Sequence, residues 1–108
     1  MPVNAIINET ISSNTTTGPI KVRRGGAHVI EFIRTAGSID LEVQISFDGS
    51  TYVTLTDTSG TDVSSTLDGT TDYKRWELLA QVDSYYQIVS TNNSSGSVDA
   101  KMTRIISE

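Results

Sequence analysis

The sequence predicts an all-β protein: an antiparallel β-sandwich or jelly roll of about eight to nine short strands with an extended N-terminal arm. Residues 39–47, IDLEVQISF, alternate apolar and polar side chains throughout, as expected of a strand with one face in a core. Turn-forming residues recur about every eight to twelve positions. Finally, 14 Ser and 15 Thr beside an apolar fraction of 36% suit a thin sandwich with hydrated outer faces.

Length and charge limit the organisation and the partners. The 108 residues correspond to one domain, which we divide into an arm and linker, residues 1–19, and a single β-sandwich domain, residues 20–108. A net charge of −5 disfavours nonspecific attraction to nucleic acid or anionic lipid. No run reaches the ~18 apolar residues of a membrane span, and the first residues lack the features of a signal peptide. We therefore expect synthesis in the cytoplasm, and neither nucleic acid nor membrane as a partner.

The N-terminal segment has its own strand pattern. Four apolar residues share one parity: Val3, Ala5, Ile7 and Ile11. The polar sequence SSNTTTGP, residues 12–19, is typical of a linker. Such an arm either folds back as an edge strand or reaches onto a neighbouring subunit, and a disordered tail is a third arrangement. The four apolar residues are therefore candidate interaction residues.

Two strands precede residues 39–47. Residues 20–24 form a short strand, and a Gly-Gly turn at 25–26 leads into a longer strand over 27–35. Both parities of this longer strand carry apolar groups, which indicates that it is covered on both faces or contains a bulge. Residues 36–38, Ala-Gly-Ser, are predicted to turn the chain.

The turn after residues 39–47 permits a test of register. A two-residue turn at Asp48 and Gly49 would place Val53 and Leu55 on the water face. A loop of odd length places both on the core face, and it is either a loop over residues 48–50 or a type I turn through Phe47 and Asp48 with Gly49 left-handed. We therefore predict a bulged three-residue hairpin.

The second half alternates between polar loops and strands: loop 57–62, strand 63–67, loop 68–72, strand 73–82, strand 85–92, turn 93–96 and strand 98–106. In residues 73–82 the alternation directs Trp76 inward, and a short helix capped by Asp72 is the alternative. The last strand directs four residues inward: Val98, Ala100, Met102 and Ile106.

We assign no catalytic residue and no cofactor. His28 is the only histidine, so a general base or zinc site would lack the partners that it needs, and a structural or surface role is expected. Cysteine is absent, and no serine lies in a G-x-S-x-G or S-x-x-K context. Asp57, Asp62, Asp68 and Asp72 frame two loops, but their spacing matches no EF-hand pattern, so turn chemistry is expected rather than a calcium site.

Two further groups are candidate interaction residues. Tyr85 and Tyr86 point to opposite faces of a strand, so one of them is available for an interface or for stacking on a sugar. Lys21, Arg23 and Arg24 concentrate positive charge in an acidic chain. They either meet an acidic region of a partner or of another copy, or form a solvated face.

Four segments together resemble small β-sandwich virion proteins of tailed bacteriophages: the Gly-Gly turn and strand at 25–33, SFDGSTYVTL at 46–55, the Tyr-Tyr-x-Ile strand at 85–88, and GSVDAKMTRI at 96–105. This resemblance implies a non-enzymatic structural protein of the virion, most directly a capsid decoration or cement subunit. It also implies contacts with the major capsid protein or other virion proteins, and a homo-oligomer, with a trimer favoured. The alternative is a carbohydrate-binding or receptor-binding module of the fibre or adhesin type.

Overall fold

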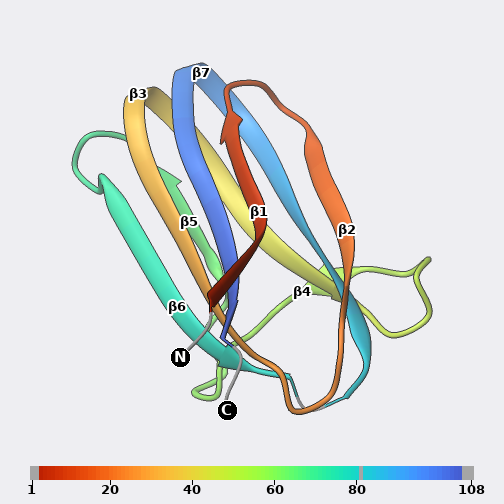
Figure 1. Cartoon of the computed structure of the whole chain (residues 1–108). Helices are drawn as coiled ribbons and strands as arrows, with labels where there is room; N and C mark the ends of the chain where they lie inside the picture. Colours follow the sequence, from red (N-terminus) through yellow and green to blue (C-terminus); the bar gives the residue numbers. More distant parts are fainter. Residues whose placement is uncertain (1–2, 81, 106–108) are drawn as a thin grey trace.

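The computed structural model describes residues 3–80 and 82–105, whose regular structure is entirely β-strand. Seven strands form one antiparallel sheet folded into a sandwich (Figure 1). Their bounds are β1 (Val3–Ile11), β2 (Thr16–Val22), β3 (Ala27–Ser46), β4 (Val53–Thr54), β5 (Ser64–Leu67), β6 (Tyr73–Leu79) and β7 (Ser84–Ile105). The all-β antiparallel class is confirmed. Over these two ranges, no helix has the length and apolar character of a membrane span.

Two long strands form the centre of the fold. β3 has 20 residues and β7 has 22, and they pair from Ala27 with Ile105 to Ser46 with Tyr85. Both bend midway, so that each contributes one half to each layer (Figure 1). β1 and β2 flank β7, while β6, β5 and β4 flank β3. The bend closes one end of the sandwich, and both ends of β3 run toward the opposite, open end (Figure 1).

The bend corrects two predicted turns. Residues 36–38 and 93–96 lie within β3 and β7, where the register shifts around Ser38 without a reversal of the chain. Gly37 has a φ of 56°, and Asn92 and Ser95 have φ values of 51° and 52°. Turn-forming residues also permit bulges, and here the partner strand continues through the irregularity. The described residues therefore form seven strands rather than eight or nine.

One apolar core fills the space between the layers. It includes Phe32 on β3 and Met102 on β7, which are both 0% exposed. Trp76 packs edge-on against Phe32, with ring centroids 5.6 Å apart. The inward position of Trp76 and the strand at 73–79 are confirmed, and the helical alternative is wrong. Val98, Ala100 and Met102 point inward as predicted, whereas Ile106 lies outside the described residues.

The N-terminal segment folds back as an edge strand. β1 pairs with β7 along residues 98–105, and Ile7 and Ile11 belong to the core. The predicted linker is also partly strand, because β2 begins at Thr16. Ser90 anchors the connection: its Oγ donates to the Ser13 carbonyl at 2.6 Å and accepts from the Thr15 N–H at 2.9 Å. The division at residue 19 therefore does not separate an arm from a domain.

The hairpin after β3 has the predicted odd register but not the predicted length. Ile45 pairs with Val53, the register that a loop over residues 48–50 would give. Pairing stops there, so the loop runs from residue 47 to 52. Leu55 is buried as predicted, whereas Val53 is 56% exposed. The shortened pairing leaves Val53 at the sheet edge, with no layer covering it.

Candidate interaction surface

The predicted interaction residues divide between core and surface. Ile7, Ile11 and Tyr86 are buried, so their side chains are not available to a partner. The backbones of Val3 and Ala5 pair with β7, and their side chains lie outside the described part of the molecule. Tyr85 is half-buried and Lys21, Arg23 and Arg24 are exposed. With Tyr86 in the core, the two tyrosines do not form a stacking platform.

An apolar groove of about 350 Å³ lies at the open end of the sandwich. Its apolar lining comes from the ends of β3, β6 and β7 and from the chain around them: Ile45, Phe47, Leu55, Leu78, Leu79, Val82 and Tyr86. Leu55, Leu78 and Tyr86 form the buried floor. Phe47, Leu79 and Val82 are 66%, 54% and 46% exposed, respectively. The groove therefore combines a core-like floor with a rim of exposed apolar side chains.

A side-chain network places Phe47 on this rim. Ser46 Oγ accepts the Gly49 N–H at 2.9 Å and donates to Asp48 Oδ1 at 2.9 Å. Asp48 Oδ1 also accepts the Ser50 and Thr51 N–H groups at 2.8 and 2.9 Å. Since this network turns the chain immediately after Ser46, Ser46 is buried and Phe47 points outward. The predicted inward position of Phe47 is therefore wrong.

Leu79 and Val82 reach the rim for a different reason. Leu79 follows the buried Leu78 on β6, so the alternation of a strand directs it outward. Val82 lies beyond the end of β6, where the predicted strand pattern no longer applies. Two consecutive leucines at the end of an otherwise alternating strand are the sequence signal that would have indicated this surface.

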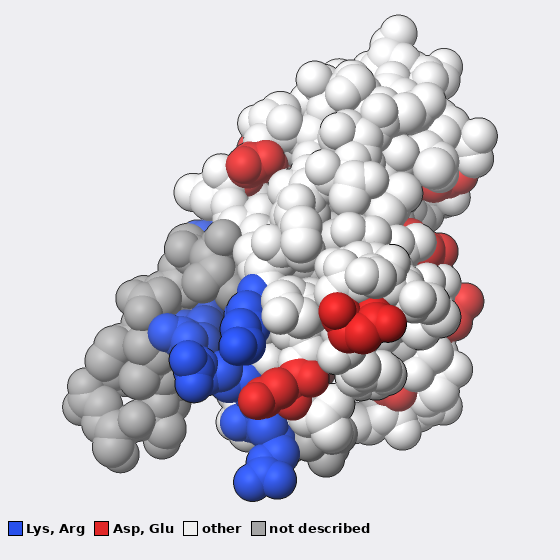
Figure 2. Space-filling view, turned by 90° about the vertical axis from the view of Figure 1, so that its right-hand side faces the viewer, with Lys and Arg blue, Asp and Glu red and all other residues white. Residues whose placement is uncertain are grey.

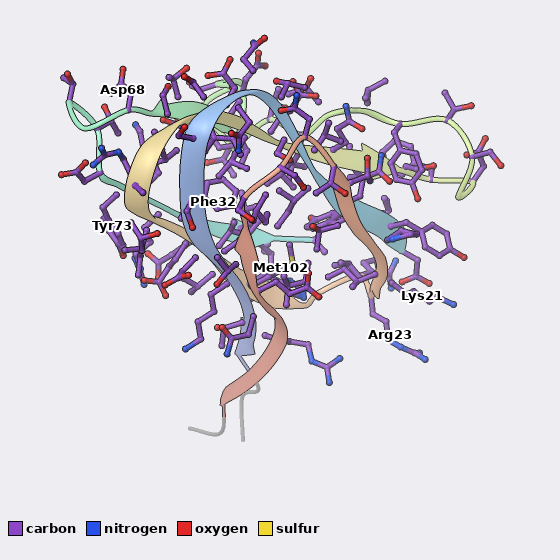
Figure 3. The ribbon with its side chains drawn as sticks, turned by 90° about the horizontal axis from the view of Figure 1, so that it is seen from above. Lys21, Arg23, Phe32, Asp68, Tyr73 and Met102 are labelled. Atoms are coloured by element: carbon purple, nitrogen blue, oxygen red, sulfur yellow. The ribbon has the colours of Figure 1, made fainter. Side chains whose placement is uncertain are left out.

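A cationic pocket adjoins the groove. Lys21 on β2, Arg23 and Arg24 in the following turn, and Arg104 on β7 line a pocket of about 460 Å³, together with His28. These are four of the eight Lys and Arg residues of the chain. Figure 2 shows Lys and Arg side chains gathering toward the lower end of the face that it displays. In Figure 3, Lys21 and Arg23 extend from the side of the molecule away from Asp68 and Tyr73.

The groove and the pocket form one continuous surface, which we call the open-end surface. Arg23 and Arg24 also line a shallow depression with Val82 and Asp83, and Val82 belongs to the groove. Asp83 Oδ1 accepts the Arg24 backbone N–H at 2.8 Å and so holds the turn against the start of β7. An apolar centre flanked by charge is the usual anatomy of a protein interface.

His28 is the buried member of the cationic pocket, with 2% of its surface exposed. Burial lowers its pKa from 6.5, and the positive charge of Arg104 acts in the same direction. The Gly26 backbone lies near the ring and raises the pKa, which opposes the shift. This contact does not have the geometry of a hydrogen bond, so Nδ1 has no partner among the described residues. The sequence did not indicate that His28 and Arg104 belong with Lys21, Arg23 and Arg24.

Two of the four aspartates that frame the polar loops make turn contacts. Asp57 Oδ1 accepts the Ser59 and Thr61 N–H groups at 2.8 and 3.0 Å. Asp68 Oδ1 accepts the Thr70 and Thr71 N–H groups at 3.0 and 3.2 Å. Within residues 3–80 and 82–105, no three His, Asp or Glu side chains converge as metal ligands would.

Comparison of the chain with models of known protein families, with curated proteins and with solved structures finds no match. A functional assignment therefore depends on the residues and geometry of this molecule.

Proposed function

We propose that this chain is a non-enzymatic structural protein of a virion, of the capsid decoration or cement type, which docks on the assembled shell through the open-end surface. The observation that carries this proposal is the apolar groove. Its exposed rim of Phe47, Leu79 and Val82 has no covering element among the described residues. Contiguous exposed apolar surface on a soluble protein is typical of a protein contact site.

The charge distribution supports a defined orientation on a protein partner. The chain carries −5 overall, yet half of its Lys and Arg residues lie beside the groove. A complementary acidic region on the shell would orient the molecule, because opposite charges steer encounter and fix register. The apolar rim would then provide most of the binding free energy.

The mechanism of stabilisation would be mass action. A subunit that binds the assembled shell, and not free capsid protein, shifts the equilibrium toward the assembled state. The folded sandwich serves as a rigid body in this mechanism. Several copies acting together, such as the trimer that the resemblance implies, would strengthen attachment through multivalency.

Cosedimentation with assembled shells tests the proposal. Deletion of residues 1–11 is unsuitable, because it would remove Ile7 and Ile11 from the core. The double variant Phe47→Ser and Leu79→Ser changes only exposed rim residues. We expect it to bind at least about tenfold more weakly, a difference of about 1.4 kcal/mol, with little change in melting temperature.

Ile33→Ser is the matched control. Ile33 is 46% exposed on β3 and does not line the groove, so this variant should sediment with shells as the unaltered chain does. Failure of the unaltered chain to cosediment would contradict the proposal, as would equal binding by the double variant. Binding on a glycan array without shell binding would favour the carbohydrate-binding alternative.

A further inference from the structure

The cationic pocket contains buried polar atoms that the protein does not satisfy. His28 Nδ1 and Arg104 Nε are both buried and make no hydrogen bond with the described residues. His28 and Arg104 are paired across β3 and β7, so both atoms belong to adjacent positions of the sheet. A buried polar atom without a partner is unfavourable, and such atoms in native proteins are usually satisfied by a ligand, ion or water.

The chemistry of these atoms specifies an acceptor. Arg104 Nε carries a proton in every accessible state of the guanidinium, so it can only donate. His28 Nδ1 donates when the ring is protonated or when the neutral ring carries its proton there. His28 and Arg104 both line the pocket, so a group in it with at least two acceptor oxygens would satisfy both donors.

The surrounding charges favour an anionic acceptor. Lys21, Arg23 and Arg24 are the other basic residues of the lining, and no Asp or Glu contributes to it. Asp83 lies in the neighbouring depression, where its carboxylate is engaged by the Arg24 backbone N–H. The volume of about 460 Å³ lies within the usual range for small-ligand sites.

The turn between β2 and β3 keeps the pocket open. A Cβ on Gly26 would lie 3.0 Å from His28 Cε1, so any larger residue there would press on the ring. Gly25 has a φ of 83°, and its N–H donates to the Ala80 carbonyl at 2.8 Å. The two glycines therefore fix the position of the arginines without filling the pocket.

We infer that this pocket is an oxyanion-binding site, in which Arg104 and His28 hold the oxygens of a phosphate, sulfate or carboxylate group and Lys21, Arg23 and Arg24 supply the surrounding positive charge. The inference does not depend on the proposed virion role. The oxyanion could be a free anion or an acidic side chain of a bound protein, and both present the same acceptor chemistry.

NMR titration at constant ionic strength tests this inference, with sulfate, inorganic phosphate and a short Glu-rich peptide as separate probes. We expect at least one probe to produce saturable shifts of the Arg104 Nε–H and of the amides of residues 25–28. Saturation by sulfate or phosphate would identify a site for free anions. Saturation by the peptide alone would identify a site for carboxylates of a protein partner.

The variants separate specific binding from general attraction. Arg104→Gln should weaken the affinity at least tenfold, whereas the control Arg75→Gln, an exposed β6 residue paired with Glu77, should leave it unchanged. Lys21→Gln alters an exposed residue and leaves the core intact. We expect it to weaken the affinity for the probe severalfold, so the test stays valid if Arg104→Gln does not fold. No saturable shift with any probe, or affinity in the Arg104 and Lys21 variants equal to that of the unaltered chain, would overturn the inference.

The pH dependence provides a second readout. The charged and titratable groups around His28 are Tyr86 on β7, whose ring centroid lies 6.1 Å away, and the residues that line the same pocket, Arg104, Lys21, Arg23 and Arg24. A bound anion favours the protonated ring, so by linkage the affinity for sulfate should rise as the pH falls from 8 to 6. His28→Gln should remove this rise, and a persistent rise in that variant would contradict the role of the ring.

Discussion

Ser46 and Asp48 are small polar residues, yet they determine whether the side chain of Phe47 points into the core or outward. Their hydrogen bonds turn the backbone at the end of β3 and expose an aromatic ring that strict alternation would bury. Three donors converge on Asp48 Oδ1: the backbone N–H groups of Thr51 and Ser50, and the Ser46 hydroxyl. Together they lower the pKa of Asp48 from 3.8 to about 2.

The lowered pKa of Asp48 predicts a specific loss of stability in acid. Its pKa in the folded chain lies below the ordinary value, so the ionised carboxylate stabilises the fold above pH 3.8, and this contribution disappears as the pH falls toward about 2. Asp48→Asn keeps an acceptor oxygen but does not titrate. Melting temperatures should therefore fall less steeply over this range in Asp48→Asn than in the unaltered chain.

Asp62→Asn, at an exposed position of a neighbouring loop, is the control for this measurement. It should follow the unaltered chain between pH 3.8 and about 2 more closely than Asp48→Asn does. Parallel curves for Asp48→Asn and the unaltered chain would show that the turn network does not depend on the charge of Asp48.

At the scale of elements, the bend of β3 and β7 creates the sandwich from a single sheet. A Cβ on Gly37 would clash with the Ser95 carbonyl oxygen, and a Cβ on Gly96 would clash with the Ser38 carbonyl oxygen. Asn93 braces the bend, because its side-chain amide donates to the Gly96 carbonyl and accepts the Gly96 N–H, both at 3.1 Å. The strands can therefore cross this point closely only with glycine at both positions.

Gly37→Ala should destabilise the protein by at least about 2 kcal/mol, because the new Cβ adds a steric clash to the cost of a left-handed backbone. Gly60→Ala is the matched control. Gly60 also has a positive φ, 82°, but a Cβ at this position would have no atom within 4 Å, so only the backbone cost of about 1 kcal/mol applies. Urea unfolding measures both. Equal losses would show that the close approach at the bend does not limit stability.

Local alternation predicted the parts of the fold that local sequence determines. The core faces of residues 39–43 and 98–102 follow from the two-residue period, as does the inward position of Trp76. The bend was not predictable in this way. Gly, Ser and Asn suit a turn and a bulge equally, and the difference depends on whether a partner strand distant in sequence continues past them.

The candidate site was partly predictable for the same reason. Lys21, Arg23 and Arg24 are close in sequence, so their charge was evident. Arg104 and His28 join them only through the pairing of β3 with β7, which no local pattern contains. The groove was missed because exposure at the ends of strands depends on which layer covers them.

At the scale of the whole molecule, the two ends of the sandwich differ in chemistry. The bend closes one end with backbone crossings, while the open end carries the apolar rim and half of the basic side chains. An acidic protein with this polarity has one end suited to docking on a protein partner. Both the proposed attachment to a shell and the inferred oxyanion site use that one face.

Hydrogen–deuterium exchange on the chain bound to assembled shells tests the central claim most directly. The account predicts that binding slows exchange at the open end, in residues 45–47, 55–58 and 78–80 and in the turn at 23–26, and leaves the bend around Gly37 and Gly96 unchanged. Protection confined to the bend, or no difference between the free and bound chain, would contradict it.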